Sequence, residues 1–271
     1  MKRKYLKYII MGAISATIAT FLLHPHEERK KGPRDYKEII ASGELKVTTE
    51  YNSVSYYVKG DSISGFHYEL VQAFAKEKGL RLNICPEMKL ENQINGINNG
   101  TYDLIANSIL VTSESKDSLL AFTIPIFVNK QILVQRKEKT DSLFIHNQLE
   151  LAGKTVYIPH GSAVSYRIRN LSKEIGDTII VKEIDKYGTE QLMAMVAHGD
   201  IDYAVCESGI AETSLPDFPQ LDIGTEISFN QFYAWGVNKQ SPVLLDSLNL
   251  WLHNFMQRKA FSDLLHKYQR D

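Results

Sequence analysis

A nine-residue pattern occurs twice in the chain and constrains the fold more than any other feature. The segment GTYDLIANS at 100–108 matches GDIDYAVCE at 199–207 in its opening glycine, in an aspartate three residues later, and in the strand-like residues that follow. A glycine that ends a helix just before a strand is typical of a junction in an alternating α/β structure. The alternative is a chance likeness of two helix-to-strand junctions.

Helical and extended periodicity alternate around both segments. In the first round a short helix ends at Gly43, and it is followed by a strand, a helix ending at Gly79, another strand and a helix ending at Gly100. The second round begins near Lys154 with a strand, a glycine turn and a helix, and it repeats the order. This alternation predicts the α/β fold class, with mostly parallel sheets flanked by helices.

The chain crosses between the two rounds twice. Strand-like residues occur at 131–137 and 232–239, and only helices are expected after the second of these segments. We therefore predict a first lobe at 32–129, an inserted second lobe at 130–228, and completion of the first lobe with C-terminal helices at 229–271. Two such crossing segments make a hinge, and sheets of this kind bind ligands beyond the carboxyl ends of their strands.

The first 31 residues differ from the rest in charge and hydropathy. The cationic stretch MKRKYLK precedes an uncharged run at 8–23, and a polar segment follows. This order is typical of a signal peptide or signal anchor, and we assign residues 1–31 to that role and a linker. A membrane-spanning helix needs about 20 residues, and the hydrophobic region of a cleaved signal peptide is shorter. The length of the run therefore does not distinguish an anchor from a cleaved signal peptide. A poor cleavage site favours an uncleaved inner-membrane anchor, with the rest of the chain on the periplasmic side.

Charge and cysteine content exclude some kinds of function. Residues 1–31 hold seven of the 31 basic and two of the 32 acidic residues, which leaves a net charge of −6 on the rest of the chain. No nucleic-acid partner is expected, because such a partner needs its phosphates neutralised. Cys85 and Cys206 lack metal-ligand spacing, and although an exported pair permits a disulfide, we expect two buried thiols. The histidines of this part also lack ligand spacing, so neither a metal nor another cofactor is expected.

Six motifs, taken in their order and spacing, carry a likeness to a known family. They are SGELKVTTE, SGFHYELVQAFAKEKGLRL, NNGTYDLIANSILVTSES, LAGKTVYIPHGSAV, HGDIDYAVCES, and YAWGVNK followed by two helices. Together they span residues 36–269, and the chain resembles the bacterial extracellular solute-binding proteins of family 3, the amino-acid-binding type. Within this family the first two motifs resemble the N-terminal solute-binding module of membrane-bound lytic transglycosylase F. With the chain ending at Asp271, no catalytic domain is expected after the module.

The resemblance implies a two-lobed periplasmic-binding-protein-like fold of type II and a set of ligand-binding residues. In the first lobe, Asn107 and Ser108 fall where the family binds its ligand, with a solvated strand end as the alternative. Tyr51 and Tyr56 fall where the family stacks an aromatic ring on the ligand, with packing at the rim as the alternative. The family arginine that binds the ligand's α-carboxylate is replaced by Ser115, which argues against a standard free amino acid.

The second lobe contributes three more candidate residues. Gly161 and Ser162 lie at a strand-to-helix turn, where free N–H groups and the helix dipole favour anionic or carbonyl groups of a ligand. A capping serine without a ligand is the alternative. Glu207 falls where the family binds the ligand's amino group through an aspartate. Arg167 or Arg169 offers a cation in place of the missing arginine, or is a solvated helix residue.

Three classes of function compete. We favour a non-catalytic extracytoplasmic solute-binding protein that closes two lobes on a small amine-bearing solute, amino-acid-like or a peptide, for transport or sensing. The second class is a regulatory module that binds cell-wall fragments, related to lytic transglycosylase F without its catalytic domain. The third is an enzyme of the cyclohexadienyl dehydratase type, with Glu207 and His160 as its acid/base pair. The expected partners are a small-molecule ligand and an ABC permease or a cell-wall fragment, and we expect a monomer.

Overall fold

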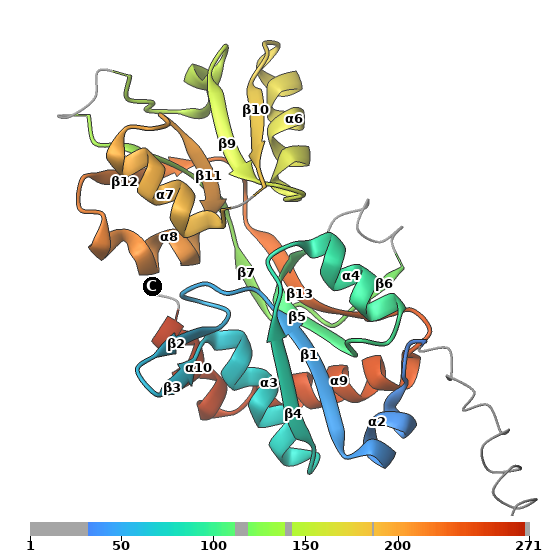
Figure 1. Cartoon of the computed structure of the whole chain (residues 1–271). Helices are drawn as coiled ribbons and strands as arrows, with labels where there is room; N and C mark the ends of the chain where they lie inside the picture. The colour runs from blue at the N-terminus through green and yellow to red at the C-terminus, as the bar shows by residue number, and fades with distance from the viewer. Residues whose placement is uncertain (1–31, 112–118, 139–142, 186, 269–271) are drawn as a thin grey trace, which may run out of the picture. The chain divides into compact units, whose positions relative to one another are not determined.

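The computed structural model describes residues 32–111, 119–138, 143–185 and 187–268 (Figure 1). Their strands form two large sheets and one two-stranded hairpin. The expected membrane anchor at 8–23 lies outside the described residues. Within the part of the chain that is described, the helices are too short or too polar to cross a membrane.

The first sheet combines strands from both ends of the chain. Its order is β4-β1-β5-β13-β6, and β7 also pairs with β13. Strands β4, β1 and β5 run parallel, whereas β13 is antiparallel to its neighbours. The strands are β1 (Glu44–Thr49), β4 (Arg81–Pro86), β5 (Leu104–Leu110), β6 (Leu120–Phe122), β7 (Phe127–Asn129) and β13 (Gln231–Asn238).

Helices cover both faces of this first sheet. Along β5, Leu104 and Ala106 belong to the core formed with α2, α3, α9 and α10, while Ile105 and Ile109 pack with Ile97 of α4. Successive side chains of a strand point to opposite faces, so an unbroken apolar run serves two cores. The helices and the hairpin are α2 (Tyr36–Ser42), α3 (Phe66–Glu77), α4 (Leu90–Asn98), α9 (Pro242–Phe255), α10 (Lys259–Tyr268), β2 (Tyr57–Lys59) and β3 (Ser62–Ser64).

The second sheet is built on the same plan from the middle of the chain. Its order is β10-β9-β11-β8-β12, with β10, β9 and β11 parallel and β8 antiparallel to both of its neighbours. Helix α6 packs on one face with Val205, and α7 packs on the other with Cys206. The elements are β8 (Gln131–Arg136), β9 (Thr155–Pro159), α6 (Val164–Ile175), β10 (Ile180–Ile184), α7 (Thr189–His198), β11 (Ala204–Glu207), α8 (Ser208–Ser214), β12 (Leu221–Glu226) and 3-10 turns at Gln148–Leu151 and Leu215–Asp217.

The predicted two-lobed α/β fold with two crossing segments is confirmed. The chain leaves the first sheet after β7, enters the second at β8, and returns between β12 and β13. The structure also contains elements that the sequence pattern did not predict, among them the hairpin β2–β3 and the short strands β6 and β7. Strand β12 extends the second sheet beyond β8, and helix α8 begins at Ser208, where only a turn was expected.

The prediction of two buried thiols is wrong for Cys85. Both cysteines are free, and Cys206 is buried on β11, but Cys85 is exposed on β4. Strand β4 lies at the edge of its sheet, and its exposed residues alternate with Leu82 and Ile84, which pack against the core. Cys85 lies on the opposite face of the strand from these two residues, which leaves its thiol in contact with solvent.

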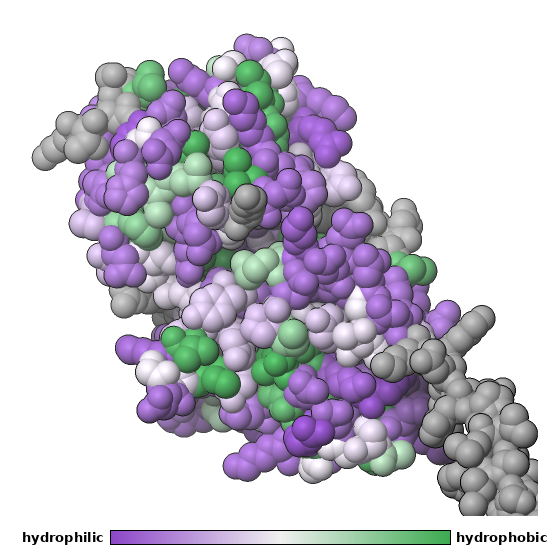
Figure 2. Space-filling model, viewed as in Figure 1, coloured by the Kyte–Doolittle hydropathy of each residue, from purple (hydrophilic) through white to green (hydrophobic). Residues whose placement is uncertain are grey.

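The surface has a mixed, mostly polar character on the face drawn in Figure 2. Apolar side chains form separate patches there, and one of them lies over the β2–β3 hairpin, where Val58 and Ile63 are exposed. Scattered exposed apolar side chains of this kind are common on folded proteins.

Candidate functional site

A cleft of about 200 Å³ lies between the two sheets, at the ends of their strands. The first lobe lines it with residues that follow or end β1 and β5, and the second lobe lines it with the turn after β9, the start of α7 and the end of β11. The contacts that join the lobes here include a hydrogen bond from the Ser108 hydroxyl to Glu207, one of 2.8 Å from the Ser53 N–H to Glu190, and an ion pair of 3.7 Å between Lys89 and Asp185. Residues of both lobes thus enclose one space.

Six of the seven candidate residues line this cleft: Tyr51, Asn107, Ser108, Gly161, Ser162 and Glu207. Tyr56 does not line it. Its ring is buried and packs edge-on against Tyr51, with ring centroids 6.2 Å apart, and against Tyr68 at 5.7 Å. Tyr56 therefore packs behind Tyr51, which presents the exposed ring to the cleft.

Asn107 and Ser108 reach the cleft from opposite faces of β5. The Asn107 amide donates to Gln93 of α4 at 3.2 Å and to Glu50 at 3.1 Å, whereas the Ser108 hydroxyl contacts His67 of α3 at 3.2 Å. The alternation of side chains along a strand explains this division. Each residue is thereby tied to a different helix.

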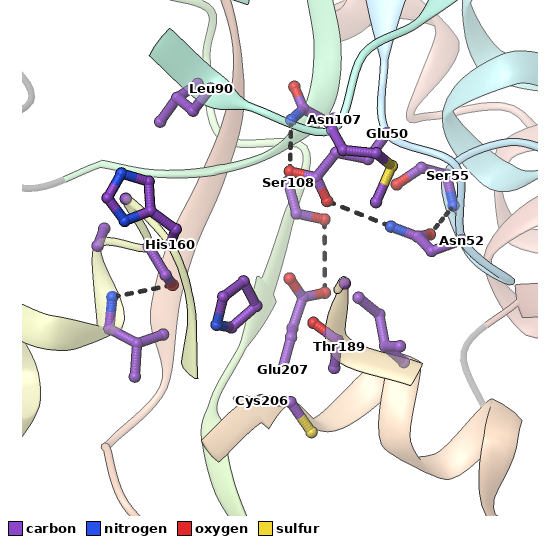
Figure 3. Close-up of a pocket in the computed structure, with 18 of the residues that line it drawn as sticks. Glu50, Asn52, Ser55, Leu90, Asn107, Ser108, His160, Thr189, Cys206 and Glu207 are labelled. Atoms are coloured by element: carbon purple, nitrogen blue, oxygen red, sulfur yellow. Dashed lines mark hydrogen bonds between the residues drawn. The ribbon is translucent and has the colours of Figure 1, made fainter. Parts of the chain in front are cut away.

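Glu207 ends β11 and is only 8% exposed. Its Oε1 accepts a hydrogen bond from the Ser108 hydroxyl at 3.4 Å (Figure 3). It accepts a second from the Asn129 amide at 3.0 Å. The pKa of Glu207 is raised to about 8, mainly by burial and also by the negative charge of Glu50, while the two hydrogen bonds oppose the shift. The two hydrogen bonds of Glu207 thus do not fully offset the cost of burying its negative charge.

Glu50 is the second acid of the cleft, and the sequence interpretation missed it. It follows β1 directly, is half-buried, and accepts hydrogen bonds from Asn107 and from Asn52 at 3.3 Å (Figure 3). Burial raises its pKa, and these hydrogen bonds lower it. An acidic residue immediately after a buried parallel strand was the available signal, because ligand sites lie at such strand ends.

The turn after β9 has partners of its own. The N–H of Gly161 donates to Glu183 at 3.0 Å, and the Ser162 hydroxyl accepts from the N–H of Val164 at 3.4 Å. His160, which lines the cleft, pairs with Glu183 at 2.9 Å. The Gly161 N–H is therefore already bonded to an acid of the protein, and Ser162 contributes a helix-capping contact.

The cations considered as replacements for the family arginine lie away from the cleft. Arg167 donates to the carbonyl of Ile227 at 2.8 Å and pairs with Glu174, and Arg169 stacks on Tyr166. Neither residue lines the cleft. Ser115 lies outside the described residues. Arg167 is thus engaged by the protein itself with only 15% of its side chain exposed, and Arg169 lies against a tyrosine ring.

A model of the bacterial extracellular solute-binding proteins, family 3, matches residues 45–271. The chain belongs to this family. The resemblance inferred from the six motifs is thereby confirmed.

Curated relatives of this solute-binding protein carry the name membrane-bound lytic murein transglycosylase F. The relative from Aeromonas salmonicida is 32% identical over 203 residues, which cover 75% of this chain and 40% of the relative. The relative from Cellvibrio japonicus is 28% identical over 207 residues, or 76% of this chain and 41% of the relative. The chain therefore spans less than half the length of these proteins.

Solved structures of similar fold are amino-acid-binding proteins. A mutant of ArgBP from T. maritima has a TM-score of 0.74 at 25% identity and covers 86% of this chain and 97% of that chain. The arginine-bound truncated form of the same protein has a TM-score of 0.71 at 25% identity, with coverage of 81% and 99%. The type II two-lobed fold predicted for this solute-binding protein is thereby confirmed.

The unsatisfied polar atoms of this solute-binding protein's cleft share one property: they accept hydrogen bonds. Among the described residues, neither Glu50 nor Glu207 has an ion-pair partner. The side-chain oxygens of Asn107 and Gln131 are buried without a partner, and both residues line the cleft. A buried acceptor without a donor costs free energy. Among the residues that the structure describes, the cleft thus combines two carboxyl groups with unpaired side-chain oxygens.

Proposed function

We propose that the chain is a non-catalytic extracytoplasmic solute-binding protein whose lobes close on a small solute with a cationic, hydrogen-bond-donating group, such as an amine or guanidinium. The solute is amino-acid-like or a short peptide. The observation that carries this proposal is the pair Glu50 and Glu207, one from each lobe, in one cleft. Membership of the solute-binding family supports the general role.

The energetic argument starts from the two carboxyl groups. Each has a raised pKa because burial disfavours its charge, and the charge of Glu50 adds to the shift at Glu207. A ligand cation placed between them removes this penalty and gains charge-assisted hydrogen bonds, which are the stronger kind. Because one acid comes from each lobe, the same cation also draws the lobes together. The arginine bound to the ArgBP relative is a ligand of this chemical class.

The non-catalytic part of the proposal rests on how the two candidate acid/base residues are bonded. His160 pairs with Glu183 at 2.9 Å, while Glu207 accepts from Ser108 and Asn129. Their contacts are thus separate, and the two groups share no hydrogen bond among the described residues. The family and the amino-acid-binding structures of similar fold support binding without chemistry.

Calorimetry with arginine, lysine, glutamine and glutamate tests the proposal. We expect arginine and lysine to bind more tightly than glutamine, and glutamate to bind least. Glu50→Gln and Glu207→Gln should each weaken arginine by about 2–5 kcal/mol, because truncating one partner of a buried charge pair leaves the other unpaired. Glu226→Gln is the matched control, since this exposed acid pairs with Lys130 outside the cleft. Tight binding of glutamate, or unchanged affinity in both cleft variants, would refute the proposal.

A cell-wall fragment is the second candidate ligand, and the curated relatives favour it. Their printed name describes murein transglycosylases, and the chain matches about two fifths of their length. Muropeptides also carry free amino groups, so the acidic cleft suits them as well. A thermal-shift screen of muropeptides beside arginine distinguishes the two ligands, since a ligand at about 100 times its dissociation constant adds about 2.7 kcal/mol of stability. Stabilisation by muropeptides alone would favour a regulatory role in cell-wall metabolism.

The cellular setting belongs to the same proposal. We expect residues 8–23 to hold the protein at the inner membrane with the lobes on the periplasmic side, where it passes a solute to an ABC permease or senses it. Fractionation of cells tests this: the protein should stay with the membranes after a high-salt wash. A soluble mature form that begins between residues 20 and 30 would contradict anchoring and leave export intact.

A further inference from the structure

A chain of hydrogen bonds runs from the core of the first lobe to the acid of the second. The indole Nε1 of Trp235 donates to Nδ1 of His67 at 2.9 Å, and Nε2 of His67 lies 3.2 Å from the hydroxyl of Ser108. Ser108 in turn donates to Oε1 of Glu207 at 3.4 Å. Trp235 and His67 are completely buried, so solvent does not compete for the hydrogen bond between them.

The direction of every proton in this chain follows from its first member. An indole N–H can only donate, so Nδ1 of His67 must accept. Burial lowers the pKa of His67 to about 3, so its ring is neutral at physiological pH and carries one proton, on Nε2. That proton is donated to Ser108, which leaves the hydroxyl hydrogen of Ser108 for Glu207. The same direction excludes His67 as a base that activates Ser108, because its Nε2 has no free lone pair.

We infer that His67 is a positioning residue that holds the Ser108 hydroxyl as a hydrogen-bond donor to Glu207, so that Oε1 of this carboxylate is held in place and Oε2 is left for a ligand cation. The inference deepens the proposed function and rests on it for the identity of the ligand.

The surroundings of Glu207 show why a fixed donor matters there. Oε1 also accepts from Asn129, and within the described residues Oε2 has no partner. The titratable groups near Glu207 are Glu50, the buried Cys206 beside it, and Tyr233 of β13, and none of them is a cation. Ser108 and Asn129 therefore provide the only compensation for the charge of Glu207 that the described residues offer. A serine free to turn its hydroxyl elsewhere would leave Asn129 as the one donor among the described residues.

The tautomer of His67 is the first test, and it needs no ligand. In protein carrying isotope-labelled histidine, the nitrogen signals of His67 are assigned by their loss in His67→Gln. We expect a neutral ring protonated on Nε2 across the physiological pH range. A ring protonated on Nδ1, or a charged ring, would overturn the inference.

The second test measures whether His67 acts through Ser108. The readout is the proton affinity of Glu207, followed by NMR of its labelled carboxyl group in the ligand-free protein. Ser108→Ala should raise the proton affinity of Glu207 about three- to tenfold, because the charged carboxylate loses a hydrogen-bond donor. His67→Phe should raise it about two- to threefold, because the hydroxyl is no longer oriented. His67→Gln can still accept from Trp235 and donate to Ser108, so it should stay near wild type.

The double variant that combines Ser108→Ala with His67→Phe shows whether His67 acts through Ser108. In the Ser108→Ala background, His67→Phe should add no further change to the proton affinity of Glu207 or to the affinity for arginine. An effect of equal size in both backgrounds, or none in either, would overturn the inference. If His67→Phe fails to fold, the tautomer and the Ser108→Ala titration still test it. Failure of wild-type protein to bind arginine would count against the proposed function alone, since both NMR readouts are independent of ligand.

Discussion

The two junctions that share a sequence pattern also share a backbone and meet across the cleft. Gly100 and Gly199 both adopt positive φ, at 76° and 84°, and a strand follows each of them. Counting along the pattern from each glycine makes Ser108 the equivalent of Glu207. These two residues donate and accept one of the hydrogen bonds that join the lobes. Equivalent positions of two similar lobes thus present a hydroxyl donor on one side and an acid on the other.

The aspartates of the two junctions have different surroundings. Asp103 has a fully buried side chain that pairs with Arg34 and accepts the N–H of Lys46 at 2.8 Å. The side chain of Asp202 is 47% exposed and pairs with Arg136 at 2.7 Å. The same local pattern therefore sets the backbone conformation at both junctions. The contribution of each ion pair to stability depends instead on how deeply the pair is buried.

The largest expected difference concerns these aspartates. Asp103→Asn should lower the free energy of unfolding by about 3–4 kcal/mol, because the buried Arg34 contact loses its charged partner. Asp202→Asn should cost about 0–1 kcal/mol, since a solvated pair contributes little. Urea denaturation of both variants measures the difference. Equal losses would show that burial does not distinguish the two junctions.

The next expected effect is a dependence of stability on pH, which comes from Glu207 of the second junction. The folded protein binds the Glu207 proton more tightly than the unfolded chain, since its pKa is raised from 4.5 to about 8. The resulting stability is present at acid pH and is lost as pH rises from about 4.5 to 8. Over this pH range the free energy of unfolding of Glu207→Gln should therefore rise by about 2–3 kcal/mol relative to that of wild type.

Thermal or urea unfolding at several pH values measures this gain. Glu226→Gln, a change at an exposed acid, serves as the control and should follow wild type at every pH. A Glu207→Gln curve parallel to wild type would show that Glu207 titrates as an ordinary surface acid.

The smallest expected difference lies at the glycines. Both Gly100→Ala and Gly199→Ala force a side chain into the left-handed region, which costs about 1–2 kcal/mol. At Gly199 the nearest atom to an added Cβ is the Arg136 guanidinium, at 3.9 Å, so no further cost is expected. At Gly100 the added Cβ would collide with the backbone oxygen of Gly32. Gly100→Ala should thus unfold at the lower temperature, and the reverse order would contradict the tight approach to Gly32.

Most of the fold could be predicted because it rests on local patterns. The glycines that end helices, the alternation of helix and strand, and the order of the two rounds depend on neighbouring residues. Asn107, Ser108 and Glu207 were predicted from the resemblance to the family, and their place at the ends of apolar strands agrees with the edge at which such sheets bind ligands. Strand β12 and helix α8 could not be predicted in this way, because β12 has weak alternation and α8 follows β11 without a turn.

The sequence by itself determined the family, the two-lobed fold and the strand ends that line the cleft, because short-range spacing sets backbone conformation and the faces of each strand. Only the tertiary structure decided which side chains meet. In the folded protein the charge of Glu50 acts on Glu207, and the Gly161 N–H donates to Glu183. Arg167 donates to the carbonyl of Ile227, and Cys85 is exposed at a sheet edge. Burial and hydrogen-bond partners depend on residues far apart in the chain, so no local pattern contains them.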